Sequence, residues 1–473
     1  MIDAAPSPTR ESIVDQVVCE TFARPVPINT HIHKDDQMLS FAAGVRGSEE
    51  IALADYFRSG GALLNAVRQL VTWKFESFDR VAAFLDFAGG YGRLTRFLVH
   101  ELPPERLWIA EIQPEAVAFQ EAQFGVHGIL SATNPDDLVC DQRFDCIFVA
   151  SLFTHLPEAT FTAWLTKLYS LLNPGGLLIF SVHDAVLLMP GEVMPEQGLY
   201  FREASEIASL DTRDYGMSIV TESFVRAAVL QATGSTAYHR IPYGLQYHQD
   251  LYLLANEPQP DFSTLYYRHG PYGFVDAGKW VDRDQFWLRG WAIDVTPDSA
   301  VKEIQVFVDG RLRQKCLPFT ERPDVDAQFP NACASHAGWA CSSYVPDATA
   351  QSRLLVKVVS TQDAECVIYI GTIGALARGE HEPESTLAAL ESTLAQQQTI
   401  VALQQDLADL HYHVAEKNRY IARLEAVLEQ KNRHIGKLER LVNRQERALR
   451  GLPVRIGLRV QRALAPQSRR GGR

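Results

Sequence analysis

Residues 84–93 read Phe-Leu-Asp-Phe-Ala-Gly-Gly-Tyr-Gly-Arg, and this stretch decides the fold class. An apolar run that ends in an acid predicts a buried strand, and the small residues after it predict a tight loop that opens a helix near Gly92. Small residues let the backbone approach a bound ligand, and a helix N-terminus favours negative charge. A glycine loop alone also fits a simple strand-to-helix turn, so its meaning depends on the neighbouring segments.

Strand patterns alternate with helix patterns between residues 80 and 256, which predicts an α/β fold with crossover helices. The predicted strands are Val81–Phe87, Leu107–Glu111, Gly128–Ser131, Phe144–Ser151, Gly176–His183, Ala237–Pro242 and Asp250–Leu254. The helices between them are expected to begin near Gly92, Pro114, Glu158 and Glu222.

A second acid, Glu111, ends the next strand about 20 residues after the loop, where a carboxylate can accept hydrogen bonds from both hydroxyls of a ribose. The alternative is that Glu111 favours the N-terminus of the helix after Pro114. Two further segments follow: Phe144-Asp145 at the start of a strand, and Leu-Asn-Pro-Gly-Gly at residues 172–176 before another.

These four segments, in this order, resemble the class I S-adenosylmethionine-dependent methyltransferases over about residues 35–255. The acid and small residues of the family's glycine motif match Asp86, Ala88, Gly90 and Gly92. Ala88 replaces a common glycine, and we expect a slightly wider turn to accommodate it. The resemblance implies an α/β, Rossmann-like sheet of seven strands with the last one antiparallel, and S-adenosyl-L-methionine as the cofactor.

By the same resemblance, Glu111 would bind the ribose, Ile112 would contact the adenine, and Ala150–Phe153 would face the sulfonium and the acceptor. We expect Tyr56 or Arg93 near the methionine carboxylate, the alternatives being core packing and a surface position. The residues expected to form the cofactor site are Tyr56, Asp86, Ala88, Gly89, Gly90, Gly92, Arg93, Glu111, Ile112, Ala150, Ser151 and Leu152.

Methyl transfer to a hydroxyl also needs a proton acceptor, and the candidates are His155, His183 and His248. His155 follows the fourth strand, with a structural hydrogen bond at a helix start as its alternative role. His183 ends the fifth strand, and His248 precedes the last one, where strand capping is the alternative. Residues 184–217 form an insertion that we expect to cover the acceptor site, and the chain shows no metal-binding pattern.

The sequence predicts five segments: a helical extension or lid at 1–75, the methyltransferase domain at 76–258, an all-β sandwich at 265–376, a coiled coil at 384–450 and a basic tail at 451–473. The sandwich resembles an immunoglobulin-like module attached to bacterial glycan-modifying enzymes, and its Asp309-Gly310 predicts a type I′ hairpin. Four tryptophans could form a carbohydrate platform or belong to the core: Trp280, Trp287, Trp291 and Trp339.

Position a of the heptad is apolar in eight successive heptads, at Ile400, Leu407, Val414, Ile421, Leu428, Ile435, Val442 and Leu449. This repeat predicts self-association through a coiled coil, as a dimer or trimer. The alternative is one long helix folded back on its own domain.

Charge is distributed unevenly along the 473 residues, whose net charge is −12. Residues 384–473 hold 16 basic and 9 acidic residues, which leaves 29 basic and 48 acidic in the rest. The basic amphipathic tail suits an anionic membrane surface, and a solvated tail is the alternative. We do not expect nucleic-acid binding, because the body is acidic and carries no recognised nucleic-acid module.

The start of the sequence lacks the pattern of a signal peptide, so we expect a cytoplasmic protein, with the cytoplasmic face of the inner membrane as a further location. The seven cysteines include no CxxC pair, and we expect their thiols to be reduced. The leading hypothesis is O-methylation of a sugar in a bacterial surface polysaccharide or its lipid-linked precursor. The alternatives are methylation of a small metabolite, or a cofactor-binding scaffold that organises glycan-assembly enzymes through its coiled coil.

Overall fold

The computed structural model describes residues 49–188, 192–203, 211–329 and 336–377, shorter pieces between residues 14 and 42, and the single residues 431 and 444. The chain divides into two units, residues 1–390 and 391–473. The predicted coiled coil and basic tail lie outside the described residues, apart from those two isolated positions, and stay predictions.

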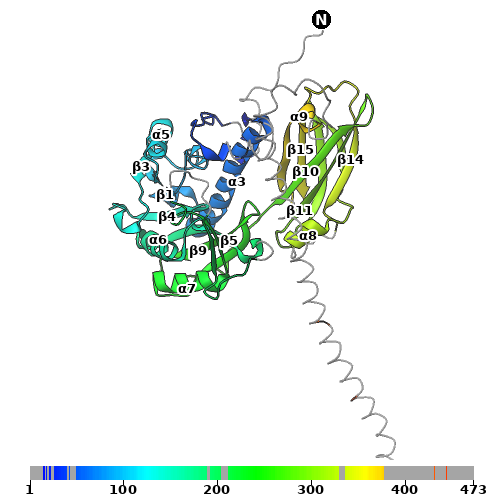
Figure 1. Cartoon of the computed structure of the whole chain (residues 1–473). Helices are drawn as coiled ribbons and strands as arrows, with labels where there is room; N and C mark the ends of the chain where they lie inside the picture. The colour runs from blue at the N-terminus through cyan, green and yellow to red at the C-terminus, as the bar shows by residue number, and fades with distance from the viewer. Residues whose placement is uncertain are drawn as a thin grey trace, which may run out of the picture. The chain divides into compact units, whose positions relative to one another are not determined.

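Strands between residues 84 and 255 of the first unit form a nine-stranded, mostly parallel sheet (Figure 1). Its strands are β1 (Phe84–Phe87), β2 (Leu107–Glu111), β3 (His127–Leu130), β4 (Phe144–Val149), β5 (Leu172–Asp184), β6 (Leu199–Arg202), β7 (Met217–Val220), β8 (His239–Leu245) and β9 (Gln249–Ala255). Strand β9 runs antiparallel to β5 and to β8, whereas β1 to β5 pair in parallel. All seven predicted strands are present, so the Rossmann-like sheet with a reversed last strand is confirmed.

Strands β6 and β7 were not predicted. Strand β6 lies in the expected insertion at residues 184–217, and β7 begins at the last residue of that insertion and pairs with the end of β5. In the continuously described part of the first unit, the helices are α3 (Glu49–Phe75), α4 (Thr95–Leu98), α5 (Pro114–Phe124), α6 (Glu158–Ser170), α7 (Glu222–Thr233), α8 (Pro323–Gln328) and α9 (Ile373–Ala377). Short 3₁₀ helices occur at Phe78–Arg80, Pro104–Arg106, Pro135–Asp137, Leu152–Thr154 and Ala185–Leu187. None of the described helices is long and apolar enough to cross a bilayer.

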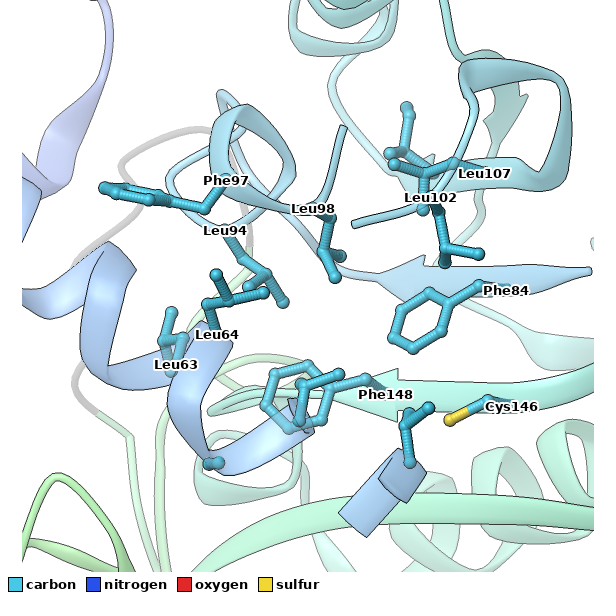
Figure 2. Close-up of a cluster of buried hydrophobic side chains, with 14 of the residues drawn as sticks. Leu63, Leu64, Phe84, Leu94, Phe97, Leu98, Leu102, Leu107, Cys146 and Phe148 are labelled. Atoms are coloured by element: carbon cyan, nitrogen blue, oxygen red, sulfur yellow. The ribbon is translucent and has the colours of Figure 1, made fainter. Parts of the chain in front are cut away.

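Alternation of side chains along the strands builds one hydrophobic core on each face of the sheet. Phe84 and Phe148 pack with α3, α4 and α5, as Figure 2 shows for the side where Leu63 and Leu64 of α3 lie. Leu85, the next residue along β1, packs instead with α6 and α7 on the opposite face (Figure 1). The carboxyl ends of β1, β2 and β4 therefore lie between two fixed helical layers.

The helical extension expected at residues 1–75 ends in one long helix, α3. One helix prediction needs correction. The helix expected at Gly92 is a run of turns followed by the one-turn helix α4. Gly92 has φ +79°, a left-handed conformation that a right-handed helix does not contain.

Residues 271–372 form a two-sheet domain with antiparallel strands throughout. One sheet contains β10 (Pro271–Trp280), β11 (Gln285–Asp294) and β14 (Gly338–Tyr344); the other contains β12 (Val301–Val308), β13 (Arg311–Cys316), β15 (Arg353–Ser360) and β16 (Glu365–Thr372). Both sheets contribute to one hydrophobic cluster. Trp339 lies inside this cluster and is 1% exposed, which removes it from any carbohydrate platform.

The hairpin predicted at Asp309-Gly310 joins β12 to β13, with positive φ at both residues (50° and 74°), as a type I′ turn requires.

Arg96 of α4 joins three separate segments of the first unit. Its side chain is fully buried and donates hydrogen bonds to the carbonyl oxygens of Asn29 (2.9 Å) and Gly92 (3.0 Å) and to the hydroxyl of Tyr56 on α3 (3.2 Å). Its guanidinium also lies 5.4 Å from the ring centre of Phe57. One cation thus holds the N-terminal segment, the glycine loop and α3 together.

We predict that Arg96→Met destabilises the protein by at least about 3 kcal/mol, because several buried carbonyl oxygens lose their donor. Urea unfolding measures this change. Arg106→Met is the matched control, since Arg106 is exposed and donates to the carbonyl oxygen of Asp79, and we expect a change within about 0.5 kcal/mol. Equal stability of the two variants would contradict the role given to Arg96.

Candidate functional site

The glycine loop after β1 reverses direction through three residues with positive φ: Ala88 (59°), Gly90 (56°) and Gly92 (79°). The Ala88 N–H donates to the Ala110 carbonyl at 2.8 Å, which ties the loop to the end of β2. The loop therefore accommodates Ala88 through a left-handed backbone conformation. A slightly wider turn was expected from the sequence for this purpose. Left-handed backbone costs about 1 kcal/mol for an alanine, which these contacts must offset.

Glu111 ends β2 directly beside this loop. Its carboxylate is 9% exposed and accepts hydrogen bonds from the N–H groups of Gly90 (2.9 Å) and Ile112 (2.7 Å). Burial raises the pKa of Glu111, and these N–H groups oppose that rise by stabilising the charged form. A buried, oriented carboxylate at this edge of the sheet is chemically suited to accept hydrogen bonds from a ribose.

A cavity of about 500 Å³ opens over the carboxyl ends of β1, β2, β3 and β4. Its size suits a small-molecule ligand. The predicted cofactor residues on its wall are Ala88, Gly89, Gly90, Arg93, Glu111, Ile112, Ala150, Ser151 and Leu152. The structure thus brings together predicted residues from three strand ends, those of β1, β2 and β4, that are distant in sequence.

Three predicted cofactor residues, Tyr56, Asp86 and Gly92, do not line this cavity. Asp86 lies beneath the loop, 2% exposed, and its carboxylate accepts a hydrogen bond from the Thr95 hydroxyl at 3.0 Å. Burial raises the pKa of Asp86 to about 7, the Thr95 hydrogen bond lowers it, and the charge of Glu111 raises it further. Asp86 therefore supports the loop from behind.

The methionine end of the site was expected to involve Tyr56 or Arg93, and the structure places Arg93 on the wall. Tyr56 is buried on α3 and donates to the carboxylate of Asp36 at 2.7 Å. Asp36 itself lines the cavity. A guanidinium and a carboxylate on one wall match the carboxylate and ammonium groups of an amino acid.

Of the three candidate bases, only His155 lines the cavity. Its Nδ1 lies 2.7 Å from the Gly216 carbonyl oxygen, and its ring stacks on Tyr215 with centres 4.5 Å apart. His183 lies behind the wall, 7% exposed, with the His248 ring edge-on at 5.1 Å. Burial lowers the pKa of His183 to about 3, with smaller effects from the charges of His248 and His155, so His183 is neutral near pH 7.

The cavity wall also contains residues that were not predicted from the sequence as site residues. They are Asp36, Gln37, Met38, Phe87, Tyr91, Ala110, Gln113, Ser131, Ala132, Thr133, Leu156, Trp164, Asp211, Asp214 and Tyr215. Ser131–Thr133 follow β3, and the rule that ligands bind at the carboxyl ends of parallel strands could have identified them. Asp211, Asp214 and Tyr215 lie in the insertion expected to cover the acceptor site, although no pattern singled out these three residues. The segment that contains Asp36 carries no comparable pattern, because long-range packing alone brings it to the wall.

Among the described residues, no group of three or more His, Cys, Asp or Glu side chains could hold a metal ion.

Residues 85–178 match a family model for a methyltransferase domain, and no curated protein matches the chain. Solved structures share weak similarity. The N-methyltransferase NodS from Bradyrhizobium japonicum, in complex with S-adenosyl-L-homocysteine, is 16% identical, and the match covers 48% of this chain and 100% of that one, with a TM-score of 0.30.

A 1,6-didemethyltoxoflavin-N1-methyltransferase from Burkholderia thailandensis is 17% identical, with 49% of this chain and 93% of that one covered and a TM-score of 0.29. A methyltransferase from Clostridium acetobutylicum is 14% identical, with 37% and 83% covered and a TM-score of 0.27. These scores are too low to identify a substrate.

Substitutions at Gly90 and Gly92 are expected to differ in effect, the first on cofactor binding and the second on stability. A Cβ atom at Gly90 would meet no heavy atom within 4 Å, whereas one at Gly92 would lie 2.5 Å from the Phe124 ring. We predict that Gly90→Arg abolishes S-adenosylmethionine binding in calorimetry at a stability cost of about 1 kcal/mol. Gly92→Ala should lower stability by about 2 kcal/mol or more. Full binding by Gly90→Arg would place the cofactor elsewhere.

The buried neutral His183 predicts acid sensitivity. Its folded pKa of about 3 lies below its ordinary value of 6.5, so below pH 6.5 the unfolded chain takes up a proton that the folded chain does not. Stability therefore falls as the pH falls from 6.5 toward 3, by about 2 kcal/mol between pH 7 and pH 5.

In urea unfolding at pH 7 and pH 5, His183→Gln should lose this part of the pH dependence. Its control, His127→Gln at an exposed position, should retain it. The same acid-induced loss in His183→Gln and in the wild type would show that His183 is not the group responsible.

Proposed function

We propose that this S-adenosylmethionine-dependent methyltransferase transfers a methyl group to a hydroxyl of a sugar, in a bacterial surface polysaccharide or its lipid-linked precursor. The observation that carries the proposal is the fixed imidazole of His155 on the cavity wall. A hydroxyl must lose its proton as it attacks a methyl group, whereas a neutral amine attacks through an existing lone pair. A base at the wall therefore favours a hydroxyl acceptor.

The hydrogen bond at Nδ1 sets the tautomer of His155. The Gly216 carbonyl oxygen can only accept, so Nδ1 must be the donor in their 2.7 Å contact. In the neutral ring the lone pair then lies on Nε2, which is the atom able to take a proton. The Gly216 N–H in turn donates to the His155 carbonyl at 2.9 Å, so the two residues hold each other in place.

S-adenosylmethionine, when bound, supplies an activated methyl group on a positively charged sulfur. The roles of the chain are to bind and orient: Glu111 for the ribose hydroxyls, Arg93 for the carboxylate and Asp36 for the ammonium group. Because the transfer is an in-line displacement, holding the two reactants in the correct geometry supplies much of the rate.

Residues 211–216 of the insertion support a polar acceptor. Asp211, Asp214 and Tyr215 line the same cavity as His155. Carboxylates accept hydrogen bonds from hydroxyl groups, and the carboxylate of Asp211 is oriented by Arg213 at 2.6 Å. A polyhydroxylated acceptor fits this lining better than an apolar one. The predicted coiled coil and basic tail agree with a membrane-associated glycan enzyme, by analogy of architecture.

Mass spectrometry of purified surface polysaccharide tests the function. Cells that lack the gene, and cells with His155→Gln in the chromosome, should lose the methyl groups that wild-type cells carry. Glutamine can still donate to the Gly216 carbonyl, so S-adenosylmethionine affinity should change little while turnover falls about 10²- to 10⁴-fold.

Unchanged methylation in the deletion strain would overturn the polysaccharide proposal and direct attention to a small metabolite. Full methylation by His155→Gln would remove His155 as the base. The scaffold hypothesis would be favoured by a different result. The protein would bind S-adenosylmethionine, and the deletion strain would make less polysaccharide, but the methyl content of that polysaccharide would be unchanged.

A further inference from the structure

We propose that Gln249 is a positioning residue that connects the two-sheet domain to the cofactor cavity through residues 242–248. These residues, the irregular end of β8 and the turn that follows it, are called the β8–β9 turn below. The inference rests on S-adenosylmethionine occupying the cavity described above, and it assigns a role in binding to a domain that contributes no residue to the cavity wall. Three sets of contacts carry it.

The β8–β9 turn has a strained backbone. Tyr243, Gln246 and Tyr247 all have positive φ, at 57°, 53° and 59°. Such conformations are unfavourable for bulky residues and persist only where the surroundings impose them. The contacts that hold this turn therefore decide its conformation.

The chain from residue 267 onward supplies those contacts on one side. The ring of Tyr247 stacks on Tyr272 of β10, with centres 4.6 Å apart and planes 10° from parallel, and its hydroxyl donates to the Gly270 carbonyl. The Tyr267 hydroxyl donates to the Gly244 carbonyl at 2.6 Å. Tyr247 is 7% exposed in a cluster that includes Phe329.

Helix α3 holds the other side of the turn. The side-chain amide of Gln246 donates to the Ser59 carbonyl at 3.1 Å and contacts its hydroxyl at 2.6 Å. The turn is thus fixed between α3 and the first strand of the two-sheet domain.

Gln249, which follows the turn directly, reaches the cavity wall. Its side-chain oxygen accepts a hydrogen bond from the Ser181 hydroxyl at 2.6 Å, and its nitrogen donates to the Ser151 hydroxyl at 3.0 Å. Ser181 in turn accepts the Ser151 N–H at 2.8 Å. Ser151 lines the cavity with φ 63°, so another strained residue depends on this network.

Packing on Tyr247 should therefore influence the position of Ser151, through Gln249. Loss of the Tyr272 stack would allow the strained turn to relax, and Gln249 would move with it. The expected effect is weaker cofactor binding, although Tyr272 does not touch the cavity.

A double-mutant cycle with S-adenosylmethionine calorimetry tests this coupling. Gln249→Met removes both side-chain hydrogen bonds at similar volume and should weaken binding about tenfold. Tyr272→Ala should weaken it about three- to tenfold, and the double variant should bind no more weakly than Gln249→Met alone. Tyr247→Phe keeps the ring but loses the hydroxyl, and it serves if Tyr272→Ala does not fold.

Gln246→Met releases the other side of the same turn from Ser59, so it should weaken binding as Tyr272→Ala does. A control in the two-sheet domain separates this coupling from general destabilisation. Trp287→Ala removes an aromatic ring from β11 that lies beside Lys279 and Arg289, and it should leave binding unchanged.

Additive effects of Gln249→Met and Tyr272→Ala, or wild-type affinity in folded Tyr272→Ala, would overturn the proposal. Failure of the wild type to bind S-adenosylmethionine at all would instead contradict the proposed function, so the two failures are distinguishable.

Discussion

The buried guanidinium of Arg96 is the interaction on which the cofactor side of the molecule depends. It donates to main-chain oxygens of the N-terminal segment and of the glycine loop and to Tyr56 on α3. A buried cation is costly unless its hydrogen-bonding capacity is satisfied, so these segments must all be in place together. Asp36 reaches the cavity wall because Tyr56, itself held by Arg96, donates to it.

Burial also sets the electrostatics of the site. Asp86 and Glu111 end adjacent strands on either side of the glycine loop, and both have pKa values raised by loss of water. Their partners differ: a threonine hydroxyl from the short helix behind the loop holds Asp86, and backbone N–H groups hold Glu111. Glu111 therefore faces the cavity as a hydrogen-bond acceptor, whereas Asp86 supports the loop.

The two-sheet domain extends this dependence beyond the nine-stranded sheet. Its first strand packs on the strained turn before β9, and β9 is the reversed strand that completes the Rossmann-like sheet. The side chain of Gln249, at the start of β9, holds the segment after β4 where Ser151 lies. An accessory domain packed in this way can influence a cavity that it does not touch, because rigid elements transmit displacement.

The sequence alone predicted the strands of the sheet, because strand periodicity is a local property of the chain. The reversed last strand and the cofactor followed from the resemblance carried by Asp86, Gly90, Glu111 and the later motifs. The sequence also identified residues of the loops after β1, β2 and β4 that line the cavity, since the carboxyl ends of parallel strands meet at one edge of a sheet. Only the tertiary structure decided that Asp36, Asp211 and Tyr215 join that wall, that Asp86 lies behind it, and that His155 alone among the candidate bases faces it. These outcomes depend on packing between segments far apart in the chain, and on the burial that follows from it, which no local pattern encodes.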